Sequence, residues 1–351
     1  MTTTARWLPD FMENQRLLLA WPYRSDVWRK HAEPARDALI KLIKQLSANT
    51  PVSLVVPAST SDSVPEALKS VQRIEIDYDD IWLRDTTPLW QLNSDGQLAA
   101  LSFDFDGWGG VQNDIAADKV FSQSLCSRLK SPLTNNLLIA EGGAFTHNGQ
   151  GDWLIGLACI KLRNPAMTEL EITSLLGRLL PGQRLHFFDG ALVADETGGH
   201  IDNMALFVDA NTLLYAATDN TAHPDYKTCQ ALKKQLDKLP AYIQTIPLPL
   251  PLPQLPASEE REGIELTSSS LKRTVELPLL CSYVNVLQTS KLVAVPQFGL
   301  TTDAQALMTV CEALPERKVI AVDAREFVLG GGGLHCISHN LPDLEQMSSN
   351  R

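Results

Sequence analysis

Apolar residues recur along the chain in two patterns, one with helical spacing and one of short runs rich in branched side chains. Leu39, Leu42 and Leu46 follow one another at intervals of three and four residues. This spacing predicts an amphipathic helix over residues 35–46, with Pro34 at its start. The same pattern predicts four more helices, over residues 115–129, 168–180, 224–236 and 302–314.

Short apolar runs bounded by turn residues predict strands between these helices. Residues 88–92 and 98–103 flank a turn at 93–96, which predicts a hairpin. Because each predicted helix lies between pairs of short strands, we expect repeated ββαβ-like units around a common centre rather than an alternating βαβ sheet. The other predicted strands cover residues 17–21, 52–56, 74–77, 137–140, 153–155, 185–188, 204–208, 212–216, 282–287, 292–295, 319–322 and 327–329.

A proline-rich stretch interrupts this pattern at residues 246–256. Proline fixes φ and has no N–H to donate, so the stretch is predicted to be an extended surface connection rather than a core strand. The strand and helix pattern resumes after it. This favours one closed catalytic domain over residues 1–351 rather than two domains.

The composition is typical of a soluble protein with a substantial core, because 44% of the 351 residues are hydrophobic and 20% are charged. The net charge of −11 argues against a nucleic-acid partner, since phosphates select basic surfaces. No apolar run has the length of a membrane span, and the first ten residues lack a signal-peptide pattern. The six cysteines are scattered without zinc spacing, which favours a cytoplasmic protein with reduced thiols.

Four consecutive glycines, Gly330 to Gly333, stand shortly before Cys336. Glycine permits positive φ and the close approach of a ligand or another segment. The apolar run at 327–329 predicts a strand that ends at this turn, and a cysteine placed there would be presented as a nucleophile. The alternative is a buried apolar cysteine beside a tight turn, the usual place of a free thiol.

Three other short segments place ionisable side chains beside glycines or at predicted strand ends. They are residues 82–85, 141–143 and 200–202. Strand ends of different units converge in a radial fold, so we expect these groups to meet Cys336 at one axial mouth. Since side chains two residues apart share a face of a strand, His200 and Asp202 are expected to point the same way.

A thiol and a histidine alone would fit a cysteine protease or an acyl transferase. The crowded carboxylates argue against both classes, because they disfavour a thiolate. A planar guanidinium removes this conflict, since Asp85 and Asp202 would each accept two of its N–H groups and its charge would favour ionisation of Cys336. His200 would protonate the leaving ammonia and later activate water. Glu141 would orient His200, keep it protonated or contact the guanidinium itself.

Plainer interpretations of the single motifs stay open at this point. Arg84 and Asp85 would also suit a surface ion pair of little energetic value. Glu141 would also suit the cap of a turn. His200 and Asp202 would also suit a metal site, although the other histidines and the cysteines form no recognisable completing motif.

These motifs resemble those of the agmatine deiminases, and the matches keep the family's order over nearly the whole chain. The main matches are Trp82-x-Arg84-Asp85, Glu141-Gly142-Gly143, Asp195-Glu196-Thr197-x-Gly199-His200-x-Asp202-Asn203 and Gly331-Gly332-x-x-His335-Cys336-Ile337. Further matches are Ala20-Trp21-Pro22, Trp108-Gly109-Gly110, Arg163-Asn164-Pro165, Pro224-x-Tyr226 and Ser282-Tyr283-Val284-Asn285. The resemblance implies the pentein fold of the guanidino-group-modifying superfamily, a pseudo-symmetric five-bladed α/β propeller of ββαβ-like units.

The resemblance also implies a reaction and a set of roles. The reaction is hydrolysis of agmatine, a small cationic guanidine, to N-carbamoylputrescine and ammonia through a covalent amidino-thioether, without cofactor or metal. Glu196 is expected at the far amine of agmatine, where an acid would repel an α-carboxylate. A homodimer and a role in polyamine biosynthesis or agmatine breakdown are further expectations. The other implied residues are Cys336 as nucleophile, His200 as acid and base, Glu141 as its partner, Asp85 and Asp202 as guanidinium clamp, and Trp82 and Trp108 beside the substrate.

The chain departs from the family pattern at Gly198, Gly333 and Thr87, where Asp, Asn and Gly are usual. These positions lie in the motifs around the expected pocket, so the choice of guanidine stays open. Deimination of arginine or peptidylarginine would need a basic residue for the carboxylate or an open groove for a peptide, and Glu196 argues against the free amino acid. A non-catalytic pentein binding protein would be expected to have lost the nucleophile or the clamp.

Overall fold

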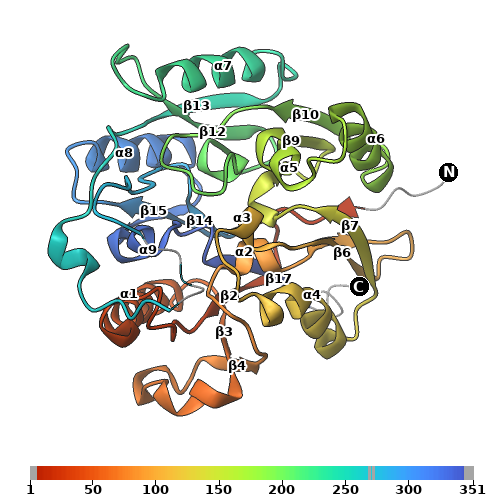
Figure 1. Ribbon diagram of the computed structural model, residues 1–351. Helices are drawn as coiled ribbons and strands as arrows, with labels where there is room; N and C mark the ends of the chain where they lie inside the picture. The colour runs from red at the N-terminus through yellow and green to blue at the C-terminus, as the bar shows by residue number, and fades with distance from the viewer. Residues whose placement is uncertain (1–5, 268–269, 271–272, 344–351) are drawn as a thin grey trace.

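The strands of the computed structural model, which describes residues 6–267, 270 and 273–343, form five sheets around a common centre (Figure 1). The longer helices lie around the outside, and each begins and ends within two residues of its predicted limits. They are α1 (Glu33–Leu46), α4 (Ala116–Leu129), α6 (Glu169–Leu179), α7 (Tyr226–Leu236) and α8 (Asp303–Ala313). Shorter helices are α2 (Leu83–Thr86), α3 (Gly107–Gly110), α5 (Leu157–Arg163) and α9 (Arg325–Gly330).

Four of the sheets repeat the expected ββαβ unit. In each, two antiparallel strands are followed by helical structure and by a third strand that pairs parallel with the second. A further strand, β1 (Arg6–Trp7), pairs with the first of these sheets at its edge. The units are formed by β5 (Leu89–Leu92), β6 (Leu98–Asp104) and β7 (Leu133–Ile139); β8 (Phe145–His147), β9 (Asp152–Gly156) and β10 (Arg184–Phe188); β11 (Ala205–Phe207), β12 (Thr212–Ala217) and β13 (Gln244–Pro249); and β14 (Leu287–Gln288), β15 (Leu292–Gln297) and β16 (Lys318–Asp323).

The fifth sheet joins the two ends of the described chain and closes the ring. Its strand β17 (Ser338–Pro342) pairs antiparallel with β2 (Gln15–Ala20), which pairs parallel with β3 (Val52–Val56), and β3 pairs with β4 (Gln72–Glu75). Strand β2 lies between two partners and its leucines are fully buried, which explains its continuous apolar run. Cys336 lies two residues before β17, so closing the ring also positions the thiol.

One predicted strand is a helix. Residues 327–329 belong to α9, which ends where Gly331 takes a left-handed conformation with φ of 117°. The strand of this unit, β16, already ends at Asp323, and the apolar run packs as one buried helical face. A left-handed glycine is the usual residue after a helix end, so the glycine run acts here as a helix stop.

Two other sequence predictions need correction. Residues 244–249 form strand β13, although the proline pattern predicted a surface connection from residue 246. Strand β13 lies at the edge of its sheet, where the missing N–H groups of proline leave no ladder bond unmade. Of the predicted strand 282–287, only Leu287 pairs in a sheet, and the side chain of Ser282 instead donates to the carbonyl of Asn203 at 2.7 Å. Within the described residues, no helix has the length and apolar character needed to cross a membrane.

Candidate active site

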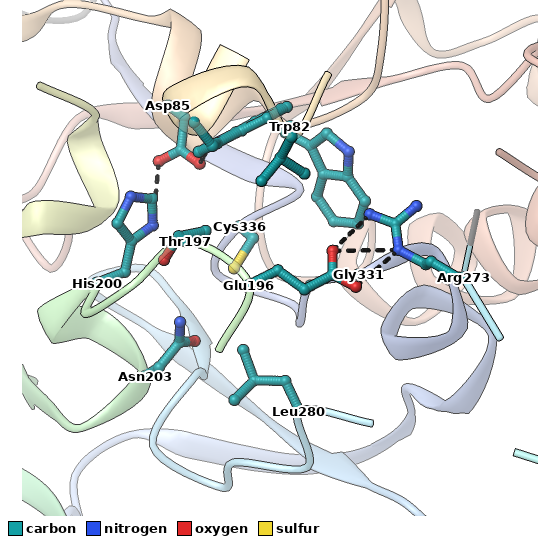
Figure 2. A pocket seen from close by; sticks show the side chains of 13 residues that line it. Trp82, Asp85, Glu196, Thr197, His200, Asn203, Arg273, Leu280, Gly331 and Cys336 are labelled. Carbon is teal, nitrogen blue, oxygen red and sulfur yellow. Dashed lines mark hydrogen bonds and ion pairs between the residues drawn. The ribbon is translucent and has the colours of Figure 1, made fainter. Parts of the chain in front are cut away.

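A pocket at the centre of the ring holds Cys336 in its wall and measures about 420 Å³ with its open mouth. Figure 2 shows the thiol between His200 on one side and Glu196 on the other. Six of the eight residues that the sequence analysis selected line this pocket, namely Trp82, Asp85, Trp108, Glu196, His200 and Cys336. Glu141 and Asp202 are fully buried and lie behind the wall.

Cys336 lies in a turn between α9 and β17, and the glycines before it allow that turn to pack tightly. A Cβ atom on Gly332 would lie 2.6 Å from the ring of Trp82 and 3.0 Å from Cβ of Cys336. Asn285 Nδ2 lies 3.3 Å from Sγ and donates to it. Burial raises the pKa of the Cys336 thiol well above its ordinary value, and the charges of Asp202 and Asp85 raise it further. The unliganded thiol is therefore protonated at neutral pH.

His200 lies at the start of a short 3₁₀ turn, η5 (Ile201–Asn203), so the strand spacing from which His200 and Asp202 were expected to share a face does not apply. Its Nε2 is 3.3 Å from Oε2 of Glu141, and its Nδ1 is 3.8 Å from Oδ1 of Asp85. Burial alone would lower the pKa of His200, but the charges of Asp85 and Glu141 outweigh it and raise the pKa to about 10. The imidazole therefore carries a proton to give at neutral pH.

Glu141 is held by two cations. Arg163 Nε donates to Oε1 at 2.8 Å, and His200 contacts Oε2. Burial would raise the pKa of Glu141, but His200 and Arg163 together bring it below its ordinary value. Arg163 also donates to the carbonyl of Thr197 at 2.7 Å, so it ties Glu141 to the loop that carries Glu196. The expectation that Glu141 partners His200 agrees with this geometry.

Asp85 enters the pocket from the short helix α2. Its Oδ1 accepts from the backbone N–H of Gly143 at 2.9 Å, and its Oδ2 accepts from Nε1 of Trp108 at 2.9 Å. Burial raises the pKa of Asp85, and His200 only partly offsets this. A Cβ on Gly143 would lie 2.4 Å from Nδ1 of His200, so this position requires glycine.

Asp202 connects the pocket to a buried line of charges. His335 Nδ1 lies 2.6 Å from Oδ2 of Asp202, and its Nε2 lies 2.9 Å from Oδ2 of Asp10. Asp10 in turn accepts from Nη1 of Arg84 at 3.1 Å. Burial and then Arg84 would lower the pKa of His335, but its bonds to Asp10 and Asp202 raise it above the ordinary value. Arg84 is buried, so the interpretation of a surface pair with Asp85 is wrong.

One oxygen of Asp202 has no hydrogen-bond partner. Oδ1 is buried, and no donor within the described part of the chain reaches it. The charge of Asp202 is close enough to raise the pKa of the Cys336 thiol. A buried carboxylate oxygen without a donor costs free energy, so this oxygen is suited to a ligand that brings N–H groups.

Glu196 lies at the outer part of the pocket, where its carboxylate is bonded to Arg273. Nε of Arg273 donates to both oxygens, at 3.0 Å and 3.2 Å, and Nη2 donates to Oε2 at 2.8 Å. Arg273 also lines the pocket. Sequence reasoning missed Arg273, because it belongs to no recognisable motif and follows a run of serines. Its partner, Glu196, lies 77 residues earlier in the chain. Gly198, Gly333 and Thr87, the departures noted above, are not among the lining residues.

The buried group of Glu141, Cys159 and His200 brings one possible metal-ligand atom from each residue within 4.8 Å of the others. Its chemistry does not favour a metal. Glu141 is already bonded to Arg163, the raised pKa of His200 keeps it protonated, and burial raises the pKa of the Cys159 thiol well above its ordinary value. Metal ligands must be deprotonated, so this group suits proton transfer better.

Comparison with known proteins gives the family. The model of the Porphyromonas-type peptidyl-arginine deiminases matches residues 6–342. The chain belongs to this family. It is 29% identical to the agmatine deiminase of Ectopseudomonas mendocina and 28% identical to that of Pseudomonas putida, each alignment covering 96% of this chain and 94% of the relative.

Solved structures agree with this assignment. The agmatine deiminase of Enterococcus faecalis superposes with a TM-score of 0.88 at 25% identity, covering 96% of both chains. An agmatine deiminase of C. jejuni with substrate bound superposes with a TM-score of 0.83 at 25% identity, covering 97% of this chain and 96% of that one. The expected five-bladed pentein propeller is confirmed.

Proposed function

We propose that this protein is an agmatine deiminase, which hydrolyses agmatine to N-carbamoylputrescine and ammonia. The observation that carries the proposal is the pair of buried carboxylates beside Cys336, Asp85 and Asp202. One oxygen of Asp202 accepts from no donor within the part of the chain that the structure describes. A guanidinium is planar and rich in N–H donors, so it would satisfy Asp202 and Asp85 together. The curated relatives that carry the name agmatine deiminase support this choice of guanidine.

Binding of the cation prepares the thiol for attack. The positive guanidinium next to Cys336 offsets the charges of Asp202 and Asp85, which lowers the pKa of the thiol. Once the thiol proton has passed to solvent, Sγ forms a bond to the central guanidinium carbon and gives a tetrahedral adduct. His200 donates its proton to one nitrogen, the bond from carbon to that nitrogen breaks, and ammonia leaves. An amidino-thioether on Cys336 remains.

Water completes the reaction. His200, now neutral, accepts a proton from a water molecule while the oxygen bonds to the amidino carbon. The bond from carbon to Sγ then breaks, the hydroxyl proton of the adduct passes to Sγ, and N-carbamoylputrescine leaves with the oxygen derived from water. Glu141 keeps the imidazole oriented through both proton transfers, because Arg163 fixes the position of its carboxylate.

The remaining expectations belong to the same proposal. Residues 1–351 would form one catalytic domain that acts on a small guanidine without cofactor or metal. The six cysteines are free thiols, in keeping with a cytoplasmic location. A homodimer and a place in polyamine metabolism follow only from the likeness to the family.

Ammonia release from purified protein and agmatine, after treatment with a chelator, tests the proposed function. We expect turnover in the wild type and loss of more than about a thousandfold in Cys336→Ser, since removal of a catalytic nucleophile has effects of this size or larger. Acid quenching during turnover should trap a mass increase on Cys336 that matches the amidino adduct. Cys311→Ser, a change at the exposed thiol, is the matched control and should retain activity. Turnover that survives in Cys336→Ser would exclude the mechanism.

A further inference from the structure

The outer part of the pocket carries a charge pair where the sequence predicted a single acid. Arg273 and Glu196 share three hydrogen bonds, and both side chains line the same pocket as Cys336 (Figure 2). Their side chains are only 12% and 24% exposed, so the pair forms part of the pocket wall rather than an ordinary surface contact. The far end of the substrate therefore meets both signs of charge.

The backbone near the nucleophile makes room for Arg273. A Cβ atom on Gly331 would lie 2.5 Å from Nη2 of Arg273 and 3.1 Å from its Cζ. Because no side chain fits there, the guanidinium rests directly on the glycine turn that leads to Cys336. Its bonds to Glu196 use Nε and Nη2, so the Nη1 side of the guanidinium lies outside this pair.

This arrangement changes which far ends the pocket accepts. A lone Glu196 would attract the ammonium of agmatine and repel a carboxylate. With Arg273 beside it, the net charge of the pair is zero, and a carboxylate gains a partner that is always ionised and matches its geometry. L-Arginine has the same spacing from guanidinium to ammonium as agmatine, with one carboxylate added to the carbon that bears the ammonium.

On the basis of the proposed function, we propose that Arg273 is a specificity-determining residue that lets the same site hydrolyse guanidines whose far end carries a carboxylate beside the ammonium. Glu196 binds the ammonium, and Arg273 binds the carboxylate through N–H groups turned from Glu196. The zwitterionic far end replaces the ion pair with two matched pairs, so no charge in the pocket wall is left without a partner. The chemistry at Cys336 is unchanged, with ammonia leaving and water entering.

The test compares kcat/KM for agmatine, L-arginine and 4-guanidinobutyrate in the wild type and in Arg273→Gln. We expect the wild type to release ammonia from L-arginine. In the variant, kcat/KM for L-arginine should fall at least about tenfold through a higher KM, because the carboxylate loses a charged partner in the pocket wall. Its kcat/KM for agmatine should stay the same or rise. Glu196→Gln should lower kcat/KM for agmatine more than kcat/KM for L-arginine. The wild type should prefer L-arginine to 4-guanidinobutyrate, which has no ammonium for Glu196 and holds its carboxylate one carbon nearer to the guanidinium.

Arg29→Gln is the matched control. Arg29 makes the same three-bond contact with Glu326, at 3.0, 3.3 and 2.8 Å, with 21% and 13% side-chain exposure, and it does not line the pocket. Its ratio of arginine to agmatine activity should equal that of the wild type.

Each result separates the specificity proposal from the proposed function. Turnover of agmatine but not of L-arginine by the wild type would overturn the role of Arg273 and leave the agmatine activity standing. An equal loss on both substrates in Arg273→Gln would also overturn it, because that is the effect of a merely structural residue. Turnover of L-arginine alone would support the carboxylate-binding role of Arg273 and overturn the agmatine assignment. If none of the three guanidines released ammonia, both the role of Arg273 and the proposed function would be overturned.

Discussion

The two ends of the pocket hold their charges in different ways. At the guanidine end, Asp85 and Asp202 belong to different units of the ring, and each is fixed by donors that lie beside or behind the pocket wall. At the far end, Glu196 is fixed by one side chain, Arg273, across the pocket wall itself. The first arrangement leaves Oδ1 of Asp202 without a donor among the described residues, available to the cation of the proposed substrate, whereas the second cancels its own charge.

This difference assigns separate tasks to the two ends. The buried acids of the guanidine end act on the reacting group, so changes there should alter the rate of the chemical step. The pair at the far end meets atoms that do not react, so changes there should alter the choice of substrate. Binding energy at a remote group sets specificity, whereas charge beside the reacting carbon stabilises the transition state.

Among the changes that compare the two ends of the pocket, the largest expected effect is that of Asp202→Asn. The amide keeps the shape but removes the charge, so the guanidinium loses one side of its clamp. We expect kcat/KM for agmatine to fall about a hundred- to a thousandfold, as when one preorganised electrostatic group is lost from an active site. The matched control is Asp118→Asn, because Asp118 is also buried and has one oxygen that no donor in the described part of the chain reaches. Unlike Asp202, it is not among the charges that raise the pKa of the Cys336 thiol. Equal losses in both variants would show that burial alone, and not the clamp, explains the effect.

The pH dependence of kcat/KM tests the guanidine end without mutation. Burial, Asp202 and Asp85 raise the pKa of the Cys336 thiol, so the free enzyme holds its nucleophile protonated at neutral pH. His200, with a pKa of about 10, keeps its proton over the same range. The thiolate fraction should therefore rise with pH, and kcat/KM should increase about tenfold per unit between pH 6 and 8. Circular dichroism across this range is the control for unfolding. A flat profile would contradict the raised pKa of the thiol.

The smallest expected effect sharpens the far end. In Gly331→Ala, the new Cβ collides with Nη2 of Arg273. We expect the ratio of arginine to agmatine activity to fall about threefold, because specificity follows the position of the guanidinium. Gly299→Ala is the control, since Gly299 also has a positive φ, of 76°, but no neighbour lies within 4 Å of its Cβ position. Both variants should lose about 1–2 kcal/mol of unfolding free energy from the left-handed backbone. An equal ratio in both would mean that Gly331 has no part in placing Arg273.

Local pattern was enough to predict most of the fold. The helices followed from apolar spacing and from signals such as Thr168, whose side chain caps α6. Predictions from pattern alone failed where the secondary structure of a segment depends on its neighbours in the fold. Residues 327–329 belong to a short helix that ends at Gly331, and β13 tolerates prolines because it is the edge strand of its sheet among the described residues. Neither fact can be read from hydrophobicity.

The residues of the site also divide into those that the sequence predicted and those that it did not. The acids and the histidine beside glycines were visible in the sequence, since glycine at 143 or 332 is required for close contacts over a short range. Asp10 and Arg273 were not, because each acts on a partner far along the chain, His335 and Glu196 respectively. Contacts of this kind depend on how the units close into a ring, and no spacing in the sequence encodes them.

The pairing of β17 with β2 has a consequence for how the active site assembles. Almost the whole described chain separates the two strands, and Cys336 lies directly before β17. The thiol is therefore placed beside the acids and the histidine by a contact between segments far apart in the sequence. Such a contact is slow to form, because a long loop must close first. A chain whose sheets have formed without this pairing would carry the nucleophile in its sequence but not in its active site.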